Sequence, residues 1–127
     1  MIIKKSTEFS RDFEVKPDLK REQLLNKTIE FLAEEIQETK DAIRENDREE
    51  IIDGFGDVAF IAINGIYKEF RSAGDRHETA VKKVEDVLNR ICDANLGKKQ
   101  QDGSIKYVNG KVQKPEGWKA PQYKDLL

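Results

Sequence analysis

Apolar and polar positions alternate with the period of an α-helix over most of the chain. Between residues 18 and 44 an apolar side chain recurs every three or four positions, which places one apolar stripe along a helix. The stripe consists of Leu25, Ile29, Leu32, Ile36 and Ile43. We therefore predict a long amphipathic helix whose core face is this stripe, with Asp18 as its N-cap.

The pattern predicts three further helices. A short one spans residues 6–13. A second long helix follows the break at Asn46, opens on the Asp47–Glu50 capping-box pattern and ends near Gly74. Its middle, residues 58–63, is apolar on every side, as in a helix buried on several sides. The last helix runs from about residue 77 to 95 and carries valine, leucine and isoleucine on one face.

The remaining residues change character. The runs 104–108 and 111–113 flank Asn109-Gly110, a pair that favours a type I′ hairpin. Trp118 and Tyr123 are expected to anchor the tail. The predicted fold is one all-α domain over residues 1–127, with a helical core at about 18–96 and a hairpin and tail at about 102–127. Two long antiparallel helices dominate it, because short loops join antiparallel neighbours.

Composition limits the partners. Only 37% of the 127 residues are hydrophobic and 38% are charged, so one copy buries a thin core and we expect a homodimer or homotetramer. The net charge of −2 gives no basic face for nucleic acid. No run approaches the ~20 apolar residues of a membrane span. A single cysteine, Cys92, and no signal-peptide pattern favour the cytoplasm.

Both long helices carry acids within a stripe that should pack. On the first helix, Glu35 and Glu38 share a face with apolar neighbours; on the second, Asp53 and Asp57 share a face with Phe60, Asn64 and Tyr67. Folding the chain at residues 46–47 brings the two acid pairs to one level of the hairpin, roughly 10–17 Å from the turn.

Four clustered carboxylates repel one another or take up protons. A divalent cation removes this penalty, and oxygen ligands without histidine suit Mg²⁺, or Mn²⁺ in its place. The alternative is a solvated acidic face. Glu50 fits a cap better than a ligand, and Glu34 fits an outer acid or a ligand of an additional ion. Asn64 and Tyr67 line either a base pocket or a dimer core.

The order of motifs resembles the MazG-like pyrophosphohydrolases, in the phosphoribosyl-ATP pyrophosphohydrolase-like branch found in phages and bacteria. The resemblance rests on FLAEEIQE and EIIDGFGDVAFIAINGIY in the long helices. It continues with ANLGKK at 94–99, Asp-Gly at 102–103 and GKVQKPEGWKAP at 110–121.

The resemblance implies an enzyme that cuts a nucleoside triphosphate into the monophosphate and pyrophosphate. It implies that Glu35, Glu38 and Asp57 hold magnesium, with Asp53 close by. Independently of the resemblance, the chemistry needs an activated water, which Glu35 or Glu38 can orient or deprotonate. The resemblance further implies that Asn95, Lys98 and Lys114 meet the sugar or phosphates. One position departs from the pattern, because many relatives carry a glutamate where this chain has Gly54.

Two other classes remain as alternatives. A helical adaptor or oligomerisation protein would explain the amphipathic helices but not the acids in the packed stripes. A ferritin-like di-iron protein needs Glu-x-x-His pairs, and the only histidine, His77, is far from the acids along the chain. The sequence does not identify the nucleobase.

Overall fold

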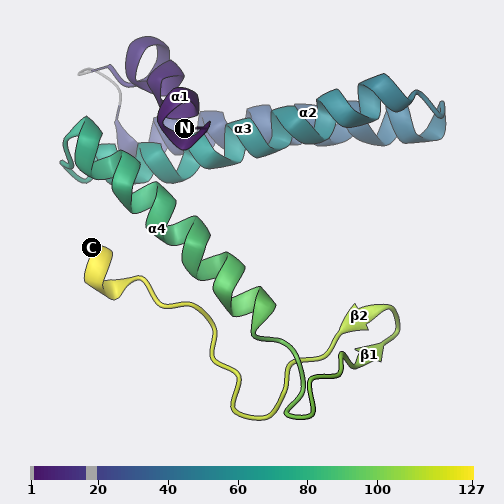
Figure 1. The fold of residues 1–127 in the computed structure, drawn as a ribbon. Helices are drawn as coiled ribbons and strands as arrows, with labels where there is room; N and C mark the ends of the chain where they lie inside the picture. The colour runs from purple at the N-terminus through teal and green to yellow at the C-terminus, as the bar shows by residue number, and fades with distance from the viewer. Residues whose placement is uncertain (1, 17–19) are drawn as a thin grey trace. The chain divides into compact units, whose positions relative to one another are not determined.

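A computed structural model describes residues 2–16 and 20–127 (Figure 1). The chain divides into two compact units, Met1–Val84 and Glu85–Leu127. The predicted N-cap Asp18 lies outside the described residues, and the N-cap of the first long helix is Lys20 instead.

The first unit begins with helix α1 (Ile2–Phe9), which continues into a π-helical turn, η1 (Ser10–Glu14). This confirms and extends the predicted short helix. The hydroxyls of Ser6 and Thr7 donate to the carbonyl oxygens of Ile2 and Ile3, at 2.7 and 2.8 Å. These two hydroxyls are thus satisfied by the backbone of their own helix, and both residues are buried.

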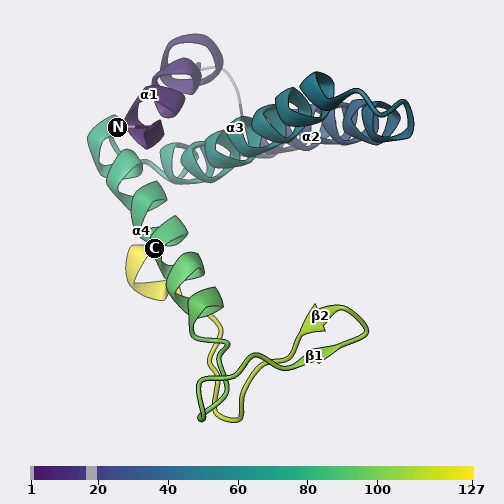
Figure 2. The same ribbon diagram turned by 45° about the vertical axis from the view of Figure 1, so that its right-hand side comes forward.

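Helices α2 (Arg21–Arg44) and α3 (Arg48–Ser72) form the predicted antiparallel hairpin and lie side by side in both ribbon views (Figures 1 and 2). Asn46 turns the chain with a φ of 56°. The carboxylate of Asp47 then accepts the Glu50 backbone N–H at 3.2 Å and caps α3. Gly74 follows the end of α3 with a φ of 109°, as expected of a C-terminal glycine.

The face of α2 that packs in the hairpin differs from the predicted core face. Leu24, Thr28, Thr39 and Ala42 are buried, and they belong to the stripe that also carries Glu35 and Glu38. The predicted apolar stripe lies beside it and remains open, with Ile29 62% exposed. Thr28, Thr39 and Ala42 are small, and they let α2 and α3 approach each other closely. The larger isoleucines remain outside this contact.

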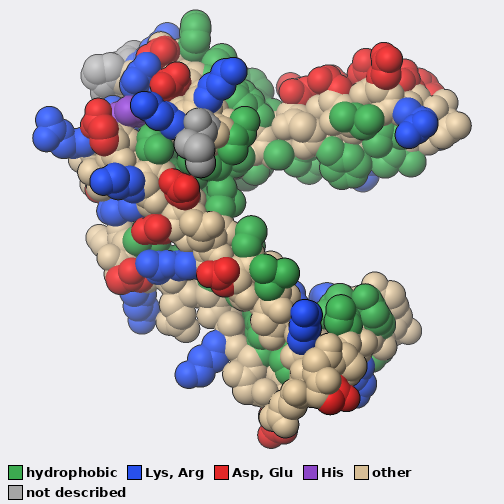
Figure 3. Space-filling model, in the orientation of Figure 1, with side chains coloured by type: hydrophobic (Ala, Val, Ile, Leu, Met, Phe, Trp, Pro, Cys, Tyr) green, Lys and Arg blue, Asp and Glu red, His purple; other side chains and the backbone are tan. Residues whose placement is uncertain are grey.

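An apolar surface therefore runs along the hairpin. It includes Ile36 and Ile43 of α2 and Ile52 and Phe55 of α3, all of them exposed. Figure 3 shows apolar side chains along one edge of the hairpin and acidic side chains along another. Surfaces of this kind mark contacts with other molecules.

Helix α4 (His77–Leu96) matches the predicted last helix. It buries Ala80 and Val84 in the first unit and continues into the second. There, strands β1 (Tyr107–Val108) and β2 (Lys111–Val112) pair antiparallel, with Tyr107 opposite Val112. Asn109 and Gly110 have φ values of 53° and 76°, which confirms the predicted hairpin turn.

The tail ends in a short 3₁₀ turn, η2 (Lys124–Leu126). Arg90 of α4 holds it through two bonds to the Asp125 carboxylate, at 2.6 and 2.7 Å. The indole of Trp118 donates to the Ala94 carbonyl at 2.7 Å, so this residue anchors the tail as predicted. No helix among the described residues has the length and apolar character needed to cross a bilayer.

Candidate functional site

The hairpin brings the acids of α2 and α3 within electrostatic reach of one another. Burial raises the pKa of the Glu35 carboxyl. The negative charges of Glu38, Asp57 and Asp53 raise the same pKa further, because a nearby like charge disfavours ionisation. The raised pKa of Glu35 therefore agrees with the prediction that the two acid pairs lie at one level of the hairpin.

These side chains do not form a closed ligand set. In the part of the chain that the structure describes, no three acidic, histidine or cysteine side chains converge as a metal site. The cluster still fits Mg²⁺ by its chemistry, since its donors are all carboxylates and their mutual repulsion favours a cation. Magnesium is usually held by one or two carboxylates together with waters and substrate phosphates, so a complete protein cage is not required.

Gly54 explains the departure from the family pattern. The residue is buried where α3 crosses α2, and a Cβ atom there would overlap the Thr39 hydroxyl. That hydroxyl is held in place, because it donates to the Glu35 carbonyl at 2.7 Å. A larger side chain at position 54 would push the helices apart, so this hairpin has no room for the glutamate that the family pattern carries there.

A cavity of about 420 Å³ opens beside the acids, enclosed by α1, η1, α2 and α3. Its volume lies within the usual range for small-molecule pockets. Four phenylalanines line it: Phe9, Phe13, Phe31 and Phe60. Glu34, Glu35 and Asp57 stand on its acidic side. The cavity thus combines aromatic walls with the carboxylates predicted to hold a metal.

Asn64 lines the same cavity and is 1% exposed. Its amide nitrogen donates to the Phe60 carbonyl at 2.9 Å, which fixes the amide orientation because a carbonyl only accepts. Its Oδ1 atom is buried and has no hydrogen-bond partner among the described residues. An unpaired buried acceptor costs about 1–3 kcal/mol, so this atom is a candidate to bind a ligand.

A buried ion pair that the sequence did not predict lies on the next turn of α3. Lys68 is 2% exposed and lines the cavity. Its ammonium group lies 2.9 Å from the Glu14 carboxylate and donates to the Thr28 hydroxyl at 2.8 Å. The other oxygen of Glu14 accepts from Ser10 at 2.7 Å. The pair ties η1 to α3. Lys68 lies four residues beyond Asn64 on the same face, and this spacing was the available signal.

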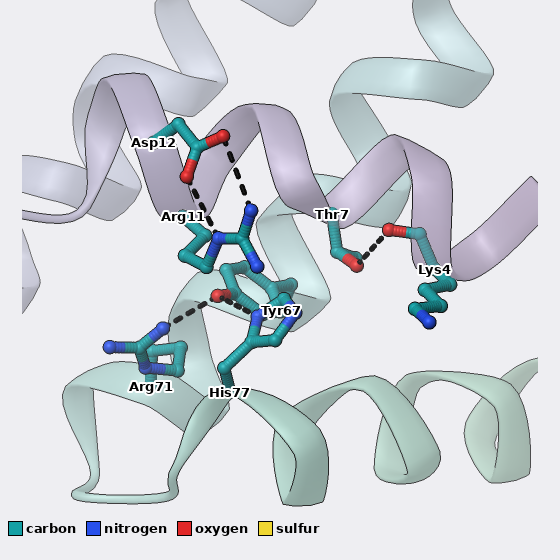
Figure 4. A network of polar contacts seen from close by, with 7 residues as sticks. All are labelled: Lys4, Thr7, Arg11, Asp12, Tyr67, Arg71 and His77. Atoms are coloured by element: carbon teal, nitrogen blue, oxygen red, sulfur yellow. Dashed lines mark hydrogen bonds and ion pairs between the residues drawn. The ribbon is translucent and has the colours of Figure 1, made fainter.

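Tyr67 takes part in a different network (Figure 4). It is fully buried, and its hydroxyl lies 2.8 Å from His77 Nδ1 and 2.6 Å from an Arg71 nitrogen that donates to it. Arg11 of η1 approaches this group while paired with Asp12 at 2.8 Å. The hydroxyl of Tyr67 therefore takes part in hydrogen bonds between α3 and the start of α4. Tyr67 does not line the cavity.

The predicted phosphate-binding lysines meet in the second unit. Lys98 and Lys114 both lie over the Trp118 ring, at 5.4 and 4.8 Å from its centroid. Lys98 also donates to the Asn95 side-chain oxygen at 2.7 Å. Two cations separated by sixteen positions in the sequence thus share one aromatic platform.

The flanking acids have separate surroundings. Glu34 borders the aromatic cavity. Glu50 borders a smaller acidic hollow of about 220 Å³ with Glu38 and Asp47, and its backbone is the partner of the α3 cap.

Comparison with known families supplies the deciding observation. Residues 7–69 match the model of the phosphoribosyl-ATP pyrophosphohydrolase family. Over this helical region the chain is similar to that family. No curated protein and no solved structure matches the chain.

The match spans the features just described in the first unit. It begins in α1, covers the acids of both long helices and includes the walls of the cavity up to Lys68. The resemblance to the MazG-like pyrophosphohydrolases is thereby confirmed, and nucleotide pyrophosphohydrolase activity is the function that the family suggests. The lysines on Trp118 lie beyond the matched residues of the phosphoribosyl-ATP pyrophosphohydrolase family.

Proposed function

We propose that this protein hydrolyses a nucleoside triphosphate, with Mg²⁺ as cofactor, to a nucleoside monophosphate and pyrophosphate. The single observation that carries the proposal is the pyrophosphohydrolase family match over the two acid-bearing helices. The raised pKa of Glu35 beside three other acids supports it, because such clusters are arranged at sites that bind cations or move protons.

The reaction breaks the bond between the α-phosphorus and the oxygen that bridges to the β-phosphorus. The oxygen of a water molecule forms the new bond to the α-phosphorus, and pyrophosphate leaves with the electron pair. Glu35, or Glu38 on the same face of α2, accepts the proton of the water. A general base works best when its pKa lies near the operating pH. The upward shift moves the pKa of Glu35 in that direction.

Glu35, Glu38, Asp53 and Asp57 would hold the cation. When bound, Mg²⁺ neutralises the charge of the polyphosphate and orients the attacked group. Lys98 and Lys114 are proposed as point charges for the phosphates, with Asn95 orienting Lys98. Replacing both lysines with alanine is expected to raise KM.

The substrate is tested with a panel of ribo- and deoxynucleoside triphosphates in millimolar magnesium. We expect release of pyrophosphate from at least one member and none in excess EDTA. A panel without turnover favours the alternative, a helical adaptor, which is also expected to show no specific shift of its melting temperature with magnesium.

We also propose that a second copy covers the exposed apolar surface of the hairpin, giving a homodimer or homotetramer. Ile29, Ile36 and Ile43 form a regular stripe on α2, the arrangement of an intermolecular helix contact. Sedimentation at micromolar concentration is expected to show the oligomer, and a stable monomer would contradict this proposal.

A further inference from the structure

We propose that the phenylalanine-lined cavity between η1, α2 and α3 binds the heterocyclic base of the nucleotide, and that Asn64 Oδ1 accepts a hydrogen bond from an N–H of that base. This inference rests on the proposed function and adds the group that recognises the substrate.

The walls of the cavity suit a flat aromatic ligand. Phe9 and Phe13 stack on each other with ring centroids 5.0 Å apart, and Phe9 also contacts Phe60 at 5.3 Å. Both Phe9 and Phe13 remain exposed, at 42% and 67%, so these rings keep free faces. A nucleobase stacks readily on such faces, whatever its identity.

The polar group in the cavity supplies direction. The amide nitrogen of Asn64 is held by the Phe60 carbonyl, so the atom left without a partner is the acceptor. A ligand that fills the cavity also excludes water from the Asn64 Oδ1 atom. Unless the ligand donates a hydrogen bond to this atom, its binding carries the free-energy cost of an unpaired buried acceptor. Each nucleobase carries an N–H on its pairing edge, whereas a phosphate at neutral pH offers chiefly acceptors.

The position of Asn64 agrees with that of the acids. Asp57 and Asn64 both line the cavity and are seven residues apart on α3, which is about 11 Å along a helix axis. This span separates a phosphate-binding end from a base-binding end within one nucleotide.

The Glu14–Lys68 pair holds one wall of the cavity in place. Lys68 fixes Glu14, and Glu14 fixes Ser10, so η1 is fastened to α3 at the cavity wall. Lys68 is thus a positioning residue, because its ammonium group is engaged by Glu14 and Thr28.

The test measures binding by calorimetry in millimolar magnesium. The ligands are the α,β-imido nucleoside triphosphates with adenine, guanine, cytosine or uracil, and inorganic tripolyphosphate, which has no base. The best-bound analogue is also compared with a form in which every N–H of the pairing edge is replaced by N-methyl, so that this edge no longer donates. The proteins are wild type, Asn64→Leu, Phe9→Ala and, as a control on an exposed asparagine of α2 outside the cavity, Asn26→Leu.

We expect Asn64→Leu and Phe9→Ala to weaken binding of the best analogue tenfold or more, and Asn26→Leu to leave it unchanged. Tripolyphosphate binding should be the same in all four proteins, which also shows that the variants are folded. Methylation should weaken binding to wild type about tenfold and have little effect on Asn64→Leu.

The proposal is overturned if the base-containing analogues bind no more tightly than tripolyphosphate, or if Asn64→Leu binds the best analogue as wild type does. Either result leaves the hydrolase function standing when wild type still releases pyrophosphate. Conversely, base-dependent binding through Asn64 without hydrolysis supports the cavity assignment and contradicts the proposed function.

Discussion

Gly54 of α3 lies directly against Thr39 of α2, so close that a Cβ atom on residue 54 would overlap the threonine hydroxyl. The Thr39 Cβ and Cγ2 atoms would also lie only 3.1 and 3.3 Å from it. Rotating the threonine would leave the Cβ contact in place and would break the hydrogen bond from its hydroxyl to the Glu35 carbonyl. This contact sets the spacing of the hairpin at the level of the acid cluster.

The contact predicts that Gly54→Ala destabilises the protein although alanine is the better helix former. Overpacking costs typically about 1–3 kcal/mol, against a gain in helix propensity of about 1 kcal/mol. Because the Thr39 contact is close, we expect a net loss of up to about 2 kcal/mol in the free energy of unfolding, measured by chemical denaturation. Adding Thr39→Ala should recover most of it. A Gly54→Ala variant more stable than wild type would show that the helices separate freely.

The buried pair of Lys68 and Glu14 gives a second prediction. Lys68→Met leaves the Glu14 carboxylate, which is 19% exposed, without its cation. We expect a loss of about 3 kcal/mol in the free energy of unfolding. The double variant Lys68→Met/Glu14→Leu should be clearly more stable than Lys68→Met, since it removes the uncompensated charge. Equal stability of the single and double variants would contradict this prediction, because it would mean that the Glu14 carboxylate is hydrated well enough without Lys68.

His77 predicts a pH dependence of stability. Burial lowers the pKa of His77 below its ordinary value of 6.5, and the charges of Arg11 and Arg71 lower it further while Glu78 opposes them. The folded protein thus binds the proton less tightly than the unfolded chain does. The contribution of neutral His77 to the free energy of unfolding is fully present above pH 6.5. It is lost as the pH falls below 6.5 towards the pKa of His77 in the folded protein.

Protonation also disturbs the hydrogen bonds, because Nδ1 becomes a donor towards a Tyr67 hydroxyl that already accepts from Arg71. Melting temperatures between pH 7.5 and 5 should fall less steeply for His77→Gln, whose carbonyl oxygen can accept from Tyr67 without titrating. Identical slopes for wild type and variant would contradict this account.

Much of the fold follows from sequence patterns because the signals are local. The turn at Asn46–Asp47, the Asn109-Gly110 hairpin and the end of α3 before Gly74 each depend on a few neighbouring residues. The packed face of α2 did not follow, because Ile29 and its neighbours are more apolar than the stripe of Thr28 and Thr39 that is buried. A hydrophobicity pattern selects the helix face with the most favourable transfer free energy from water. The packing of α2 on α3 also depends on steric fit, and only a small side chain such as Thr39 fits opposite Gly54.

The site shows the same division. Helical spacing predicted that Glu35 and Asp57 face a common region, and the shift of the Glu35 pKa reflects it. Lys68 and Glu14 were not predicted as a pair, because a contact between residues 54 positions apart depends on how η1 docks. Tyr67 shares a periodic face with Asn64 but differs in surroundings, since the helix turns it towards His77.

The carboxylate cluster predicts opposite effects on stability and activity. Without divalent cations, Glu38→Ala or Asp57→Ala should leave the protein as stable as wild type or more stable, because one repelling charge is removed. Millimolar magnesium should raise the melting temperature of wild type and raise that of the variants much less. Glu30→Ala, on an exposed part of α2, should behave as wild type. An equal magnesium shift in all four proteins would contradict the cluster.

The most direct measurement is the position of the water oxygen after hydrolysis in ¹⁸O-labelled water. Attack at the α-phosphorus places one ¹⁸O in the nucleoside monophosphate and none in the pyrophosphate, which mass spectrometry of both products distinguishes. We predict this labelling for wild type with magnesium, and no product above background for Glu38→Ala or Asp57→Ala. Label in pyrophosphate, orthophosphate as the first product, or full turnover by either variant would contradict the account.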